Sequence, residues 1–258
     1  MSKATFTIEG DSTKYVIPLD LSEVTLSKYI AYCNIESKHL PKEIQELRQL
    51  YTDLQDISPT DKLDREPVEK RITELNEVVD SFEYKEVLLD WYAKVVEFWT
   101  GLPYDRIMGL DDGIGMQVAQ LQALYYKLEA LLIPPKEAEY SQIIEHKGEA
   151  WYLPSQYMRE ATTIEYLEAS QFQKLADDLA GNQWGVMGKI MAILVRKKDE
   201  KYHPRLVRER EQFFLGWTMD KVYTVAFFLL QRIEKLATVF QTYTAAQTLS
   251  KLRQELSD

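Results

Sequence analysis

Histidine and cysteine, the side chains that most often bind metals or act as nucleophiles, are few and scattered in this sequence. His39, His146 and His203 lie far apart, and no pair has the spacing of a metal site on a helix or of an H-E-x-x-H motif. We therefore predict that each histidine is solvated. The only cysteine, Cys33, lies on the apolar face of a predicted helix, so we expect a small core residue and not a catalytic thiol.

Acidic stretches are the next candidates for chemistry. The loop DDGIG, Asp111 to Gly115, lacks the strand and the Lys-Ser/Thr pair of a phosphate-binding loop and has too few carboxylates for an EF-hand, so we expect a helix cap. No G-x-S-x-G, Walker or dinucleotide fingerprint occurs. The sequence therefore predicts no catalytic, metal-binding or cofactor-binding residue. The alternative is a helical enzyme with an atypical site that uses Asp111, Asp112 or His203.

The stretch RKKDEKYHPRLVRERE, Arg196 to Glu211, is the one segment that leans basic. Acidic residues interrupt it, which is typical of a solvated surface. The whole chain has 41 acidic and 31 basic residues, a formal net charge of −10. This balance argues against a nucleic-acid or anionic-membrane binder, because phosphate affinity depends on clustered cations. Arg205 and Arg208 are candidate contacts for an acidic partner, and a nucleic-acid-associated factor is kept as an alternative.

Aromatic side chains are numerous, with 16 Tyr, 5 Trp and 9 Phe, and many stand in adjacent pairs. Neighbouring aromatic residues on a helix cannot all face one core, and Tyr and Trp are favoured at protein interfaces. A broad core wrapped by several helices is the alternative explanation. The candidates for interaction or packing are Trp91, Tyr92, Trp99, Trp151, Tyr152 and Tyr166.

The elements that position these side chains are predicted to be mainly α-helices with small β-hairpins, an α+β class. Glycine and proline are scarce, at 10 and 9 residues, and the periodic stretches are long. Hairpins are predicted within residues 4–17 and 140–154, the second turning at Lys147-Gly148. A helix after the first hairpin has Asp20 or Ser22 as its N-cap, with Glu23 closing a capping box. Other helices are predicted within residues 84–101, 116–132, 161–179, 184–197, 198–214 and 219–252.

Residues 40–82 differ from the rest, because Glu, Lys, Gln, Arg and Leu dominate them. EIQELRQLYTDLQDI and PVEKRITELNEVVDSF have the period of amphipathic helices with narrow apolar stripes. A narrow stripe with charged flanks is typical of an antiparallel helical hairpin or a partner-binding arm. Two ordinary surface helices are the alternative.

Two segments of the chain share one pattern: IEGDSTKYVIPLDLSEVTLSKYIAY, residues 8–32, and EHKGEAWYLPSQYMREATTIEYLEA, residues 145–169. Each has a polar turn, an aromatic-aliphatic run that ends in Pro, an acidic spacer, and a T-x-x-x-Y helix. We predict two quasi-repeated modules, each a hairpin with a helical bundle. The first spans residues 1–139, with a helical insertion at about 40–82, and the second spans 140–258. Chance recurrence of a common pattern is the alternative.

The opening F-x-I-x-G…K-Y-V-I-P…L-x-x-V-T-L-S-K-Y-I resembles small acidic proteins of tailed bacteriophages. The second opening reads W-Y-L-P-S-x-Y-M-x-x-A-T-x-x-E-Y and leads to I-M-A-I-L-V-R-K-K-D-E-K-Y and A-F-F-L-L. This longer pattern is similar to structural or assembly proteins of Bacteroidetes phages, including crAss-like ones. Tail assembly chaperones also begin with a β-hairpin and a T-x-x-x-[YF] helix. The likeness covers the first 33 residues and about 151–230, and residues 40–82 lie outside it.

This resemblance implies a non-enzymatic structural or assembly protein of a phage, associated with the tail or neck or packaged in the virion. A tail assembly chaperone present only during assembly is the alternative. The implied partners are other phage proteins or further copies of the chain. The implied location is the host cytoplasm during assembly, and also the virion if the chain is a structural component. The longest apolar segment, Val222 to Leu230, is shorter than the ~20 residues that a membrane span needs.

Overall fold

The computed structural model describes residues 4–6, 13–109, 114–132, 142–154, 162, 164–165, 167–171, 184–226 and 228–229. These residues are mainly helical, with one two-stranded and one three-stranded antiparallel sheet, which confirms the predicted class. The chain divides into two compact units. Unit 1 comprises residues 1–20 and 31–133, and unit 2 comprises residues 21–30 and 134–258. The predicted helical residues 172–179 and 231–252 lie outside the described residues.

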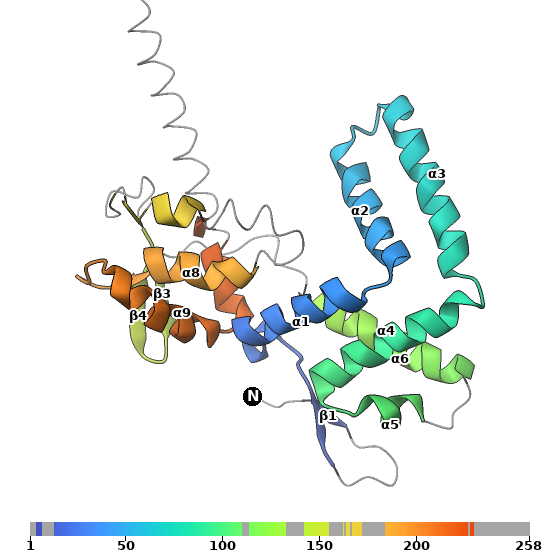
Figure 1. Ribbon diagram of the computed structural model, residues 1–258, viewed down its shortest axis with the longest axis horizontal. Helices are drawn as coiled ribbons and strands as arrows, with labels where there is room; N and C mark the ends of the chain where they lie inside the picture. Colours follow the sequence, from blue (N-terminus) through green and yellow to red (C-terminus); the bar gives the residue numbers. More distant parts are fainter. Residues whose placement is uncertain are drawn as a thin grey trace, which may run out of the picture. The chain divides into compact units, whose positions relative to one another are not determined.

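Unit 1 is a helical body that carries a small hairpin (Figure 1). Strands β1 (Ala4–Phe6) and β2 (Tyr15–Ile17) pair antiparallel, with Thr5 opposite Val16. The helices of this unit are the second part of α1 (Leu26–His39), then α2 (Lys42–Asp56), α3 (Lys62–Val79), α4 (Tyr84–Thr100), α5 (Tyr104–Met108) and α6 (Ile114–Leu132).

Helix α4 is the centre of the core of unit 1. Ten of its 17 residues are buried, so the helix packs on several sides, against α5, α6 and β2. It ends at Gly101, which adopts the left-handed conformation at a φ of 76°. The Gly101 N–H donates to the Glu97 carbonyl at 2.8 Å. A left-handed glycine after the last turn is a common way to end a helix, because glycine has no Cβ to clash there.

Helices α2 and α3, with the connection at residues 57–61, form an antiparallel hairpin that we call the arm. Figure 1 shows it extending away from α4 and α6. Leu47, Ile72 and Leu75 are its buried residues, so the arm has a small core of its own. At its tip, Arg65 donates to the carbonyls of Leu54 and Ile57, each at 3.4 Å. The two helices predicted over residues 40–82 are therefore present as a hairpin and not as separate surface helices.

Unit 2 is built around a three-stranded sheet and a cluster of apolar helices. The sheet has the order β3 (Ile143–His146), β4 (Glu149–Tyr152), β5 (Arg196–Lys197). The first two strands turn at Lys147 and Gly148, whose φ angles are 51° and 79°, as the sequence predicts. The remaining described elements are η1 (Leu21–Glu23), the first turn of α1, helical residues 164–165 and 167–171, α8 (Trp184–Leu194), η2 (Pro204–Leu206), α9 (Val207–Leu215) and helical residues 219–226 and 228–229.

Residues 21–30 join unit 2 through backbone pairing. The Leu26 N–H donates to the Trp217 carbonyl and the Met219 N–H donates to the Val24 carbonyl, both at 2.8 Å. These two bonds flank an antiparallel bridge between Thr25 and Thr218. The start of α1 therefore belongs to the C-terminal half of the sequence, an arrangement that no local pattern predicts.

Two predicted element boundaries are wrong. Helix α1 begins at Leu26, and its first-turn acceptor is Thr25, whose hydroxyl accepts the Lys28 N–H at 3.3 Å. Asp20 and Ser22 are not the N-cap, because residues 21–23 form a 3-10 turn before the helix. The helix predicted over 184–197 ends at Leu194, because Arg196 and Lys197 pair with β4 as a third strand.

Gly101 and Gly188 make a matched pair of substitutions. A Cβ at Gly101 meets no atom, so the Gly101→Ala variant carries only the cost of the left-handed backbone, and we expect it to lower the free energy of unfolding by about 1 kcal/mol. Gly188 lies inside α8 with ordinary contacts for a Cβ. Gly188→Ala is expected to leave stability unchanged or raise it by up to ~1 kcal/mol. Urea denaturation measures both, and two changes of the same sign would contradict this account.

Candidate functional site

The residues singled out in the sequence fall into two groups. Trp91, Tyr92, Trp99 and Trp151 are each at most 4% exposed and pack in the cores of their units. Arg205 and Arg208 are exposed on η2 and α9, and Tyr152 is half-buried at the end of β4. Tyr166, like Asp111 and Asp112, lies outside the described residues. The structure places the four buried aromatics in packing roles.

The base of the arm is held by a cluster of polar side chains that the sequence did not indicate. Arg48 of α2 donates to Glu36 of α1 at 2.5 Å. It also donates to two residues of α6, to the Glu129 carboxylate at 2.8 Å and to the Tyr125 hydroxyl at 2.7 Å. Tyr32 of α1 donates to the other oxygen of Glu129. One guanidinium therefore joins three helices, from positions up to 81 residues apart.

Burial and charge act against each other in this cluster. Burial raises the pKa of Glu129, although Arg48 and the Tyr32 hydroxyl stabilise its charged form. Burial and then the Glu129 charge raise the pKa of Tyr125 to about 12, so its hydroxyl keeps its proton at neutral pH. Burial alone would lower the pKa of Arg48, but its acidic and phenolic neighbours raise it. The cluster is therefore a charged hub that helps to fix the arm on α1 and α6.

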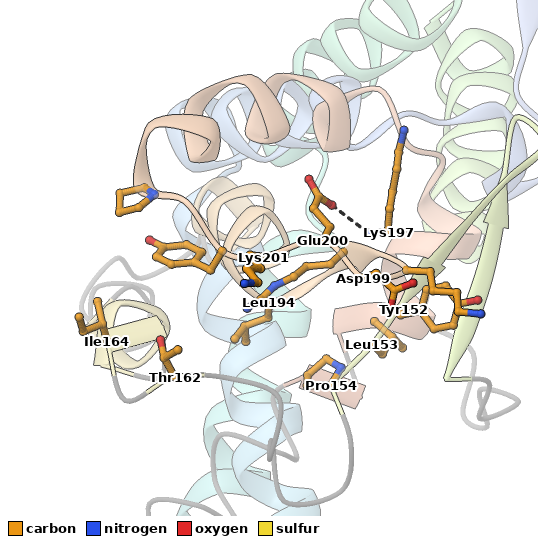
Figure 2. A pocket seen from close by; sticks show the side chains of 14 residues that line it. Tyr152, Leu153, Pro154, Thr162, Ile164, Leu194, Lys197, Asp199, Glu200 and Lys201 are labelled. Carbon is orange, nitrogen blue, oxygen red and sulfur yellow. Dashed lines mark hydrogen bonds between the residues drawn. The ribbon is translucent and has the colours of Figure 1, made fainter.

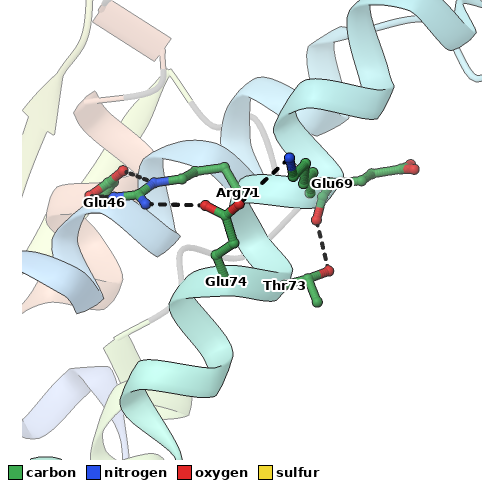
Figure 3. Close-up of polar contacts among 6 residues, drawn as sticks. Glu46, Glu69, Arg71, Thr73 and Glu74 are labelled. Atoms are coloured by element: carbon green, nitrogen blue, oxygen red, sulfur yellow. Dashed lines mark hydrogen bonds and ion pairs between the residues drawn. The ribbon is translucent and has the colours of Figure 1, made fainter.

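The rest of the arm is a solvated surface with a few apolar side chains. Figure 3 shows Arg71 of α3 reaching Glu46 of α2 with two bonds, at 2.7 and 3.1 Å, and Glu74 of its own helix at 3.4 Å. All three side chains are about half exposed, so these bonds contribute little stability. The exposed large apolar residues of the arm are Tyr51, Leu63 and Val78.

An aromatic cluster forms the core of unit 2 around a buried histidine. The Trp151 ring stacks on Phe213 at 4.8 Å and meets Phe214 and Trp217 edge-on. The His146 ring stacks on Trp217 at a centroid distance of 4.9 Å and is 6% exposed. The prediction that His146 is solvated is therefore wrong, because its strand places it on the inward face of the sheet.

His146 is held in its neutral form. Lys221 donates to the Glu145 carbonyl at 2.9 Å, and its Nζ lies 3.5 Å from Nδ1 of His146. Since an ammonium can only donate, Nδ1 must offer a lone pair there. Burial, and then the charges of Lys221 and Lys147, lower the pKa of His146, with partial opposition from Asp220 and Glu149.

A buried ion pair of unit 2 borders a cavity through one of its residues, Arg196. Glu165 is fully buried and forms an ion pair with Arg196 of β5. Thr162 and Glu165 also form a capping box, in which the Thr162 hydroxyl accepts the Glu165 N–H at 3.3 Å and the Glu165 carboxylate accepts the Thr162 N–H. The T-x-x-E spacing could have indicated this cap from the sequence. Thr162 thus starts its helix as Thr25 does.

The cavity that Arg196 helps to line has a volume of about 760 Å³ and lies entirely in unit 2 (Figure 2). It is enclosed by the end of β4, by Thr162 and Ile164, by the end of α8, and by the turn that runs from β5 to η2. Figure 2 shows Leu194 between Leu153 and Pro154 on one side and Ile164 on the other. It is larger than a cavity of about 180 Å³ that Arg48, Trp91 and Tyr125 help to line in unit 1.

Within the described ranges, no group of three or more His, Cys, Asp or Glu side chains is placed to hold a metal ion. A search of the same ranges finds no helix that is both long and apolar enough to cross a membrane. Comparisons with protein families, with characterised proteins and with solved structures find no match to this chain.

The Arg48 hub can be tested against the exposed Arg71 pair on the same arm. Arg48→Met leaves the half-buried carboxylate of Glu129 without its cation, and we expect the free energy of unfolding to fall by about 1–2 kcal/mol. This is less than the cost of breaking a fully buried ion pair, because the Arg48 side chain is 40% exposed. Arg71→Met is the control and is expected to cost clearly less, because water screens the exposed pair of Arg71 and Glu46. Equal losses of unfolding free energy in the two variants, measured by urea denaturation, would show that the Arg48 cluster stabilises the fold no more than the exposed Arg71 pair does.

The buried histidine predicts a loss of stability in mild acid. The unfolded chain binds a proton at His146 near its ordinary pKa of 6.5, whereas the folded chain resists it. The neutral His146 therefore makes its full contribution to the free energy of unfolding above pH 6.5. This contribution declines as the pH falls below 6.5, by at most ~1.4 kcal/mol per pH unit. His146→Gln is expected to flatten the slope of unfolding free energy between about pH 7 and 5.5. His39→Gln, which removes an exposed imidazole from α1, is the control, and an equal change of slope in both variants would contradict this account.

Proposed function

We propose that this chain is a non-enzymatic bacteriophage structural or assembly protein that acts through contacts with other phage proteins or with further copies of itself. The arm is the observation that carries the proposal. It has a core of three buried residues, is fixed at its base, and extends from the helical body with both of its outer faces solvated. A hairpin whose buried residues form a separate cluster presents a long surface to a partner.

The chemistry of the outer arm suits a protein partner better than a nucleic acid. Tyr51 is 47% exposed on α2, and tyrosine is a common anchor at protein interfaces. Leu63 is 85% exposed near the tip and adds apolar surface that a partner can cover. Residues 42–79 carry ten acidic and six basic side chains, and this acidic excess of four disfavours the binding of phosphate. The resemblance of both hairpin-and-helix openings to phage structural and assembly proteins supports the same class.

The time and place of action divide the proposal into two forms. A virion component is carried into the finished particle, associated with tail or neck, whereas a tail assembly chaperone is present only in the host cytoplasm. Quantitative detection of the chain in purified virions and in infected-cell lysate separates these forms. We expect the chain in virions, and its presence in lysate alone would favour the chaperone.

The role of the arm is tested by charge placed on its exposed apolar residues. The double variant Tyr51→Glu/Leu63→Glu is expected to reduce capture of a tail, neck or other virion protein from phage lysate at least about tenfold, a loss of ~1.4 kcal/mol of binding free energy. Both positions are exposed, so the free energy of unfolding is expected to change by less than ~0.5 kcal/mol for each substitution.

Val87→Glu is the matched control, because Val87 is 44% exposed on α4, outside the arm. It is expected to leave capture unchanged. A purified wild-type chain that stays monomeric and captures no phage protein would overturn the proposed function. Equal loss of capture in the control and the double variant would show that the arm is not the binding surface.

A further inference from the structure

The cavity of unit 2 offers an apolar wall of the size that small organic ligands fill. Its volume of about 760 Å³ falls in the usual range for ligand sites, roughly 300–1,000 Å³. Leu153 and Leu194 are buried residues of this wall, and Tyr152 and Pro154 continue it along the end of β4. The wall therefore favours an apolar body over a fully polar one.

Several of the charges around the cavity are already paired. Arg196 is engaged by the buried Glu165, and Lys197 binds Glu149 at 2.7 Å while its Nζ lies 5.3 Å from the centre of the Trp151 ring. Glu200 forms an ion pair with Arg210 and accepts the Lys197 N–H at 3.0 Å (Figure 2). These groups balance one another and are not available to a ligand without breaking a pair.

Three charged side chains of the lining remain: Lys198, Asp199 and Lys201. All three are exposed, and no ion pair joins them to another residue in the part of the chain that the structure describes. They leave one net positive charge beside an apolar wall, in a chain whose net charge is −10. Their exposure places this charge where a ligand anion keeps contact with water, which avoids the cost of burying it.

We propose that this cavity binds an amphiphilic carboxylate, whose apolar body lies against Leu153, Leu194 and Tyr152 and whose carboxylate lies beside Lys198 and Lys201. A single negative charge matches the single net positive charge. A phosphate monoester fits less well, because the guanidinium that would grip it in a bidentate manner, that of Arg196, is held by Glu165. Two sources share the proposed chemistry: a fatty acid and the free C-terminus of an apolar peptide.

Displacement of the fluorescent apolar anion 1-anilinonaphthalene-8-sulfonate from the full-length chain tests this proposal. We expect decanoate to displace the dye in a saturable manner, and decyltrimethylammonium and acetate to need at least about tenfold higher concentrations, because the first has the wrong charge and the second lacks the apolar body. Peptides that end in Ala-Ala-Leu, with a free or an amidated C-terminus, separate the two sources. Displacement by the free peptide but not by its amide indicates a peptide ligand, and displacement by decanoate alone indicates a fatty acid.

The exposed lysines allow a variant that does not disturb the core. Lys198→Ser/Lys201→Ser is expected to raise the dissociation constant of decanoate about tenfold and to leave that of neutral 1-decanol unchanged, each obtained from displacement after correction for the affinity of the anionic dye for the same variant. Lys62→Ser/Lys70→Ser on the arm removes the same charge elsewhere and is expected to leave decanoate binding unchanged.

The proposal is overturned if no probe displaces the dye, if decanoate and decyltrimethylammonium displace it equally, or if both double variants behave alike. The arm experiment uses neither lysine of the cavity, so the two proposals fail separately.

Discussion

The arrangement of unit 1 depends on a constraint: a charge taken out of water must be given a partner. The Arg48 guanidinium meets this constraint with Glu36, Glu129 and Tyr125, and in doing so it ties α2 to α1 and α6. The arm has only a small core of its own, and a second polar contact at its base, from the Tyr84 hydroxyl of α4 to Glu43 of α2 at 2.7 Å, acts together with Arg48 to hold it on the helical body. Without the hub, two amphipathic helices with a narrow apolar stripe could pack in several ways.

Unit 2 meets the same constraint in a different way. Glu165 is fully buried and paired with Arg196, while His146 avoids the cost of a buried charge by staying neutral against Trp217. Pairing these groups leaves the lysines of the β5–η2 turn as the unbalanced charge beside the cavity. The two units therefore present different surfaces: a long acidic hairpin suited to a protein partner, and an apolar cavity with a cationic rim.

Much of the secondary structure could be predicted from the sequence. The amphipathic period predicted α2 and α3, and the Lys147-Gly148 turn predicted the β3–β4 hairpin, because each signal comes from residues within one or two turns of each other. The predictions failed where a distant segment decided the outcome. Arg196 and Lys197 continue an apolar helix in the sequence, yet they pair with β4. Thr25 directly precedes α1 and forms a bridge with Thr218, a residue of the C-terminal half of the sequence.

The sequence by itself determined the mainly helical class, the two β-hairpins and the two helices of the arm, since periodicity and turn chemistry act over a few residues. Only the tertiary structure decided which aromatic and charged residues are buried. Trp91, Tyr92 and Trp99 were equally good candidates for an interface and for a core, and their neighbours in space assign them to the core. Arg48 and Glu129 carry no local signal at all, because the energy of an ion pair depends on the distance and burial of two atoms and not on the separation of their residues along the chain.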